Sequence, residues 1–130
     1  MKYKIILIIY LIFLGCNNSQ NKSQISSISN LKELGLILEN SKDSLICFDI
    51  YAQWCSPCRI ISPTIEKLSL DNKDKVKFYK IDINHVPEVR NIFSTQHIPH
   101  IVFVKNKSII ASLIGIQPLE SYQKIINQNK

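Results

Sequence analysis

The chain has 130 residues and a formal net charge of +6, and 45% of its residues are hydrophobic while 20% are charged. This length accommodates one globular domain and not two. The basic residues are dispersed, with no stripe of interleaved aromatics, so the composition argues against a nucleic-acid-binding protein. It favours a solvated surface with a mild attraction to anionic lipid.

Residues 1–15 are predicted to form a signal peptide that is separate from the folded domain. Lys2 and Lys4 precede an uninterrupted apolar run over residues 5–14. Ten helical residues rise about 15 Å, about half the hydrocarbon thickness of a bilayer, so this run is too short for a spanning helix. Its length is typical of the apolar core of a secretory signal. Loss of the two lysines with the signal would leave a net charge of +4.

Phe13-Leu14-Gly15-Cys16 resembles the processing box of bacterial lipoproteins. The resemblance implies cleavage before Cys16 and lipid on that residue, which would anchor the protein stably in a membrane. The alternatives are an ordinary signal peptide with an incidental cysteine and an uncleaved anchor. Residues 16–30 are almost all polar and uncharged, which predicts a tether ahead of a domain over residues 31–130. Ile25 and Ile28 alternatively begin a short edge strand.

The domain alternates between helical and strand periodicity. Asn30 is predicted to cap a helix that ends near residue 40, with Glu33 at the capping-box position. Residues 45–52 form an almost continuous apolar run, which is typical of a strand covered on both faces. A second helix is predicted over residues 58–70, with Pro63 inside it.

The second half of the chain predicts a strand over residues 75–83 and a short helix from Pro87 to residue 93. Residues 101–104 and 108–114 are predicted to pair as a hairpin. A last helix is expected to begin at Pro118. This order predicts an α/β fold with a central mixed β-sheet and helices on both faces.

The most informative motif is Trp54-Cys55-Ser56-Pro57-Cys58-Arg59. Two cysteines at this spacing can close a small disulfide ring, and at the start of a helix the first thiol is readily ionised. On its own the motif allows a redox switch, a metal site or a structural disulfide. The loop it encloses is too short for a disulfide to contribute much stability.

The chain from about residue 25 to residue 128 resembles the thioredoxin family. The Trp-Cys-Ser-Pro-Cys-Arg motif matches the family's Trp-Cys-Gly-Pro-Cys-Lys, with Ser56 in place of glycine. The other matching positions are Asp49, Pro63, Lys80, Ile98, Pro99 and Gly115. The departures from the family pattern are Tyr51 for a common tryptophan, Lys107 for a hairpin glycine, and His97 and His100 around Pro99.

The resemblance implies a dithiol mechanism. Cys55 would attack a substrate disulfide, and Cys58 would then attack Cys55, release the reduced substrate and leave a Cys55–Cys58 disulfide. Asp49 would accept the proton of Cys58, since burial in an apolar strand raises the pKa of a carboxyl group. The alternative for Asp49 is an acid at the strand end that points to solvent.

The same resemblance implies a substrate groove around the disulfide. The expected groove residues are Trp54, Pro57, Ile98, Pro99 and Gly115. Lys80 would act on Asp49 as a nearby cation, or simply face solvent. A protonated His97 or His100 would stabilise the Cys55 thiolate, and the alternative is that both are surface or packed residues.

These features predict a thiol–disulfide oxidoreductase that is exported and lipid-anchored outside the cytoplasm of a bacterium. A disulfide reductase or isomerase is favoured over an oxidase. Expected partners are disulfide-containing proteins and a membrane thiol electron donor, and the protein is expected to be a monomer without a cofactor. The alternative is a copper- or zinc-handling protein that uses Cys55, Cys58 and a nearby histidine. Cys47 is predicted to be a core residue, with a third redox thiol or an intermolecular link as the alternative.

Overall fold

A five-stranded sheet forms the centre of the structure, a computed structural model that describes residues 23–130. The expected signal peptide, Cys16 and the first part of the expected tether lie outside the described residues. The strands are β1 (Ile25–Ile28), β2 (Leu45–Tyr51), β3 (Val76–Asp82), β4 (His100–Lys105) and β5 (Ser108–Ile114). The helices are α2 (Leu31–Glu39), α3 (Ser56–Asp71), α4 (Val89–Ile92) and α5 (Leu119–Asn129).

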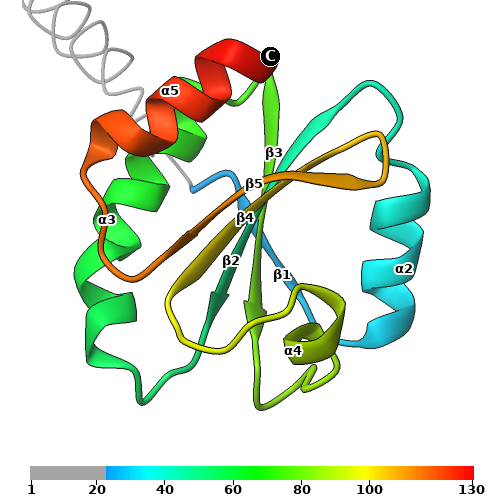
Figure 1. Cartoon of the computed structure of the whole chain (residues 1–130), viewed down its shortest axis with the longest axis vertical. Coiled ribbons are helices and arrows are strands. Elements are labelled where there is room, and N and C mark those ends of the chain that lie inside the picture. The colour runs from blue at the N-terminus through cyan, green and yellow to red at the C-terminus, as the bar shows by residue number, and fades with distance from the viewer. Residues whose placement is uncertain (1–22) are drawn as a thin grey trace, which may run out of the picture.

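The sheet is mixed, with the strand order β1-β3-β2-β4-β5. β1, β3 and β2 run parallel, whereas β4 is antiparallel to both β2 and β5. Helices α3 and α5 lie on one side of the sheet, and α2 and α4 lie on the other (Figure 1). The predicted fold class is therefore confirmed.

The central strand β2 separates two hydrophobic clusters. Its residues alternate between them, so that Phe48 and Ile50 pack with Leu34 of α2. On the opposite face Leu45 and Cys47 belong to the cluster that contains the buried residues of α3 and α5. Burial on both faces explains why the apolar run in the sequence was continuous rather than alternating.

Strand β1 corrects the predicted domain boundary. Residues 25–28 pair with β3 in parallel, with Ile25 opposite Phe78 and Ile28 opposite Ile81. Ile28 is buried in the core. Residues 25–28 therefore form the short edge strand that was the alternative to a tether, and the folded domain begins before residue 31.

Local side-chain bonds fix two of the connections. The Asn30 side chain caps α2 by accepting a hydrogen bond from the backbone N–H of Glu33, at 2.9 Å. Between β4 and β5, Asn106 and Lys107 form a two-residue turn in which φ is 51° and 65°. These values are typical of the turn that most often closes a hairpin, and the second position favours glycine. None of the helices within residues 23–130 has the length and apolar character needed to cross a membrane.

Candidate active site

The two cysteines of the motif form a disulfide at the N-terminus of α3. Their Cα atoms are 5.3 Å apart. The helix begins at Ser56, earlier than predicted, because the Cys55 side chain is its N-cap and accepts a hydrogen bond from the Cys58 N–H at 3.3 Å. Pro57 occupies the first turn, where its missing N–H has no helical partner to lose.

This position favours a thiolate at Cys55 once the disulfide is reduced. The first N–H groups of a helix lack partners within it and carry partial positive charge, which stabilises an adjacent anion. Pro63 lies inside α3 but does not end the helix, which continues to Asp71. The site therefore supplies the nucleophile that disulfide exchange requires.

Burial does not distinguish the two cysteines, because Cys55 is 4% exposed and Cys58 is 6% exposed. Their surroundings differ instead. Cys58 lines a cavity of about 270 Å³ that also contains Asp49, whereas Cys55 is the helix cap.

Asp49 lies inside the protein and faces α3. It alternates along β2 with Phe48 and Ile50, which point into the opposite cluster, and it is 9% exposed. Its Oδ1 atom is buried and has no hydrogen-bond partner among residues 23–130. Burial raises the pKa of Asp49 to about 6, although the nearby Lys80 ammonium lowers it. Asp49 is thus a buried carboxyl group with a free oxygen and a pKa near neutrality.

The cavity brings polar groups from three elements together behind Cys58. The residues that line it are Asp49, Tyr51, Ala52, Gln53, Cys58, Arg59, Ser62 and Lys80. Arg59 donates a hydrogen bond from Nη1 to the backbone oxygen of Gln53, at 2.8 Å. The volume is sufficient for water, which could carry a proton between Cys58 and Asp49.

Lys80 reaches this cavity from the neighbouring strand. It pairs in register with Asp49, and its Nζ lies 5.9 Å from the centre of the Tyr51 ring. Sequence reasoning assigned no role to Tyr51 beyond a departure from the family. The period of two along β2 places Tyr51 on the same face as Asp49, and that signal could have identified it.

Among the expected groove residues, Trp54 and Pro57 adjoin the cysteines in the chain, and Pro99 and Gly115 are hydrogen-bonded to each other. The Ile98–Pro99 peptide bond is cis, and the Pro99 oxygen accepts a hydrogen bond from Gly115 N at 2.8 Å. Gly115 has a φ of 76°, which glycine adopts without strain. Ile98 packs against the cluster that contains Cys55 and Cys58. Trp54 is 65% exposed, so it presents apolar surface directly beside Cys55.

The two histidines around Pro99 differ in their environment. His97 is exposed, whereas His100 is buried and its Nδ1 lies 2.9 Å from Thr95 Oγ1. Burial lowers the pKa of His100, so its ring is neutral at neutral pH. This counts against His100 as the cation that stabilises a thiolate.

A metal site receives no support from the geometry. Across residues 23–130, no group of three or more His, Cys, Asp or Glu side chains is arranged to hold a metal ion. Cys47 is a free cysteine with 0% exposure, and burial raises its thiol pKa well above the usual value. It therefore matches the predicted core residue.

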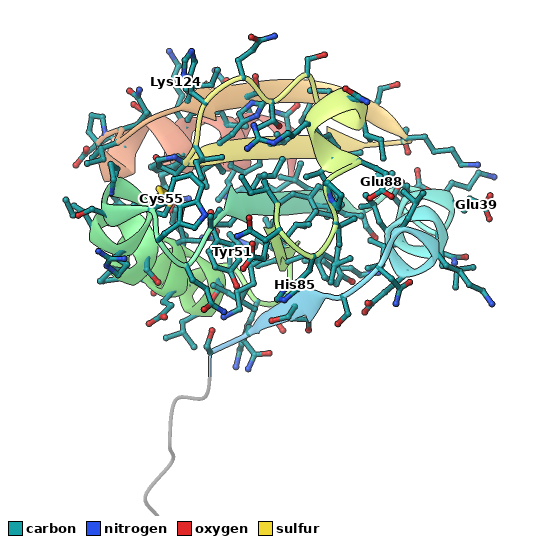
Figure 2. The ribbon with its side chains drawn as sticks, turned by 90° about the horizontal axis from the view of Figure 1, so that it is seen from below. Glu39, Tyr51, Cys55, His85, Glu88 and Lys124 are labelled. Carbon is teal, nitrogen blue, oxygen red and sulfur yellow. A yellow bond between two sulfur atoms is a disulfide. The ribbon has the colours of Figure 1, made fainter. Side chains whose placement is uncertain are left out.

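Figure 2 views the molecule from the end at which β2 and β3 finish, and Cys55 and Tyr51 both lie at this end. A disulfide at a helix N-terminus, with a buried acid in the cavity behind its second sulfur and Ile98 packed against the same cluster, defines a thiol–disulfide oxidoreductase. The protein is an enzyme of this class.

Comparison with known proteins specifies the class further. The thioredoxin family model matches residues 27–128, and the chain belongs to the thioredoxin family. It is 35% identical over 100 residues to thioredoxin AMT13 of Alternaria alternata, covering 77% of this chain and 82% of that protein. It is 33% identical over 102 residues to the thioredoxin of Rickettsia bellii, covering 78% and 97%.

Solved structures show the same relationship. The thioredoxin NaTrxh of Nicotiana alata superposes with a TM-score of 0.79 at 26% identity, covering 88% of this chain and 99% of that one. The thioredoxin of Malassezia sympodialis has a TM-score of 0.73 at 30% identity, with 81% and 92% covered.

Proposed function

We propose that this protein is a lipid-anchored thioredoxin that reduces or isomerises protein disulfides outside the cytoplasm. The observation that carries the proposed chemistry is the shared cavity of Cys58 and Asp49 behind a disulfide capped by the start of α3. A general base with a pKa near the working pH suits the deprotonation of a resolving thiol.

The proposed reaction moves two electrons. The Cys55 thiolate attacks one sulfur of a substrate disulfide, which forms a mixed disulfide and releases the first substrate thiolate. Cys58 then loses its proton to Asp49 and attacks the Cys55 sulfur. This step forms the Cys55–Cys58 disulfide and releases the second substrate thiolate. The enzyme dithiol thus loses the two electrons that the substrate disulfide gains.

The proposed location rests on the sequence. A basic start, an apolar run of signal length and Gly15-Cys16 together resemble a bacterial lipoprotein signal. Outside the cytoplasm a reductase needs electrons from across the membrane. A membrane thiol carrier is therefore the proposed donor, and proteins with accessible disulfides are the proposed substrates.

The test of the chemistry is reduction of insulin disulfides with dithiothreitol as the electron source. The native protein is expected to accelerate the reaction, and Cys55→Ser is expected to abolish it. Cys58→Ser should accumulate a mixed disulfide that mass spectrometry detects. Cys47→Ala is the matched control, because it removes a cysteine that the mechanism does not use. Acceleration that persists in Cys55→Ser would contradict the assignment of the nucleophile.

The direction of the reaction is tested by the reduction potential of the Cys55–Cys58 pair, measured at equilibrium with defined thiol buffers. A value of about −270 mV, the thioredoxin range, supports a reductase. A value of about −120 mV, the range of dedicated oxidants, would reverse the proposed direction.

A further inference from the structure

Lysines that are dispersed in the sequence gather at the end of the sheet opposite Cys55. Leu45 pairs with Val76 and Ile46 with Val104, so β2 and β3 begin where β4 finishes. This is the upper end of the molecule in Figure 1. We call the lysines of segments 39–44, 71–77 and 105–107 the basic end. They are Lys42, Lys73, Lys75, Lys77, Lys105 and Lys107.

Hydrogen bonds hold two of these segments together. The N–H of Asp43 donates to Asn106 Oδ1 at 3.0 Å, and the N–H of Lys107 donates to Ser41 Oγ at 3.3 Å. The third segment leads directly into β3, beside the start of β2. The basic end is therefore one surface and not three separate loops.

The excess positive charge of the described chain resides at this end. The same segments contain Glu39, Asp43, Asp71 and Asp74, and Asp71 is paired with Lys67 at 2.6 Å. The remaining three acids face six lysines, which leaves an excess of three positive charges. Over the rest of residues 23–130 there are seven basic and six acidic side chains, and these balance once Lys67, the partner of Asp71, is set aside.

The chain also enters the domain at this end. β1 runs parallel to β3 and pairs from Ile25 opposite Phe78, so it begins near the start of β3. Gln24 lines a cavity of about 180 Å³ together with Lys73 and Lys77. A membrane anchor ahead of residue 23 would therefore bring the basic end, rather than the disulfide, toward the bilayer.

We infer that the basic end docks on anionic phospholipid headgroups and holds the Cys55–Cys58 site away from the membrane. The inference rests on the proposed anchor at Cys16, which would keep the domain within reach of the surface. Lysines close to an anionic bilayer are attracted within a Debye length, about 10 Å at 0.1 M salt. The seven residues of β2 span about 20 Å, so the disulfide end would lie beyond that range.

The test is lysine footprinting of the anchored full chain on vesicles. An amine-acylating reagent is applied on neutral phosphatidylcholine vesicles and on vesicles that contain phosphatidylglycerol. We expect acylation of Lys73, Lys75 and Lys107 to slow at least fivefold on the anionic vesicles only, and the effect to disappear in 0.5 M salt. Lys32 and Lys124, exposed lysines outside the basic end, are the internal controls and should not change.

A variant pair tests the same surface. Combined Lys73→Gln, Lys75→Gln and Lys107→Gln should abolish the protection of Lys42 on anionic vesicles, whereas Lys32→Gln with Lys124→Gln should leave it intact. Insulin reduction by both variants verifies that they are folded. Equal footprints on the two vesicle types, or equal loss in the two variants, would overturn the inference.

The anchor is assayed separately, by flotation on neutral vesicles and by the mass of the N-terminal peptide. If Cys16 carries no lipid, the anchor proposal fails, and the footprint is then measured at raised vesicle concentration. Protection of the basic end in that assay still supports docking, and its absence overturns it. Stronger protection by duplex DNA than by anionic vesicles would identify a polyanion site and overturn the lipid assignment.

Discussion

In the proposed reaction, Asp49 serves as the proton acceptor at a cost to the stability of the fold. Its carboxyl group is buried in β2 with an oxygen that has no hydrogen-bond partner among residues 23–130. The neighbouring Lys80 offsets only part of the free-energy cost of burying the charged carboxylate, because the pKa of Asp49 is still raised to about 6. The carboxylate therefore binds a proton more readily than an exposed one does, yet it is mostly ionised at pH 7, as a proton acceptor must be.

Replacement of Asp49 by asparagine should stabilise the protein at pH 8. The folded pKa of about 6 lies above the ordinary value of 3.8, so ionisation costs stability as the pH rises from about 4 to 6, and the cost stays constant above 6. A shift of this size corresponds to about 3 kcal/mol at most. We expect the gain in the free energy of unfolding to be about 1–3 kcal/mol at pH 8 and near zero at pH 4. Denaturant unfolding at the two pH values measures it.

The control is Asp74→Asn, which removes an exposed carboxyl group and should change little at either pH. An Asp49→Asn gain of equal size at pH 4 and pH 8 would show that side-chain packing, and not ionisation, is responsible.

The same substitution should slow the resolving step. Without the carboxylate, Cys58 loses its proton acceptor, and we expect decay of the mixed disulfide at pH 7 to slow by about tenfold or more. Attack by Cys55 should be nearly unchanged, since the helix N-terminus and not Asp49 stabilises that thiolate. Rapid-quench measurement from pH 5 to 8 separates the steps. A native resolving rate that does not rise through pH 6 would argue against the role of Asp49.

At the scale of elements, the hairpin of β4 and β5 uses an unfavourable residue at its turn. Lys107 has a φ of 65°, a left-handed conformation in which a Cβ atom is strained. Asn106, with a φ of 51°, is better suited, and its side chain also accepts the bond from Asp43. The turn thus combines one residue fitted to its conformation with one that is not.

Lys107→Gly should therefore raise the free energy of unfolding by about 0.5–1 kcal/mol, because relief of the strain exceeds the added freedom of the unfolded chain. Its backbone N–H still donates to Ser41, so no hydrogen bond is lost. Asn106→Gly is the paired variant and should give no gain, since it loses the bond to Asp43. Thermal or denaturant unfolding of both variants tests this, and a loss of stability in Lys107→Gly would refute the assigned strain.

Elements with strong periodicity could be predicted from the sequence, and those fixed by distant partners could not. The 108–114 strand has the predicted bounds, and β2 differs by one residue at its end. β1 has only four residues, and its pairing with β3 has no local signature. The start of α3 was placed late because a cysteine side chain serves as the cap.

The same distinction applies to the candidate site, because some of its features follow from local sequence and others depend on distant elements. The cysteine spacing and the inward face of Asp49 follow from local sequence and strand parity. The cavity does not, because Arg59 and Ser62 reach it from α3 and Lys80 from β3. Similarly, the buried bond between His100 and Thr95 depends on packing that no local pattern encodes.

At the scale of the whole molecule, the two ends of the sheet differ in chemistry. One end carries the disulfide, the exposed Trp54 and Pro99, and the other carries the lysines and the start of β1. This polarity is the arrangement that a tethered enzyme needs if its substrates arrive from the aqueous side.

The proposed anchor predicts that Cys16→Ser releases the protein from the membrane. A serine cannot carry the thioether-linked lipid, so the variant should move to the soluble exported fraction or keep its uncleaved leader. Insulin reduction by the purified variant should equal that of the native protein, since the site lies outside the altered segment. Fractionation with mass measurement distinguishes these results. Membrane retention of a variant with its leader removed would contradict a lipid anchor.

The complete burial of Cys47 makes it an intrinsic probe of local opening. In the oxidised protein it is the free thiol among residues 23–130, and its raised pKa further suppresses the reactive thiolate. A thiol reagent should therefore modify it only when the central strand separates from its neighbours. Its labelling rate would measure how often the strand that carries Asp49 is exposed to solvent, without any added reporter group.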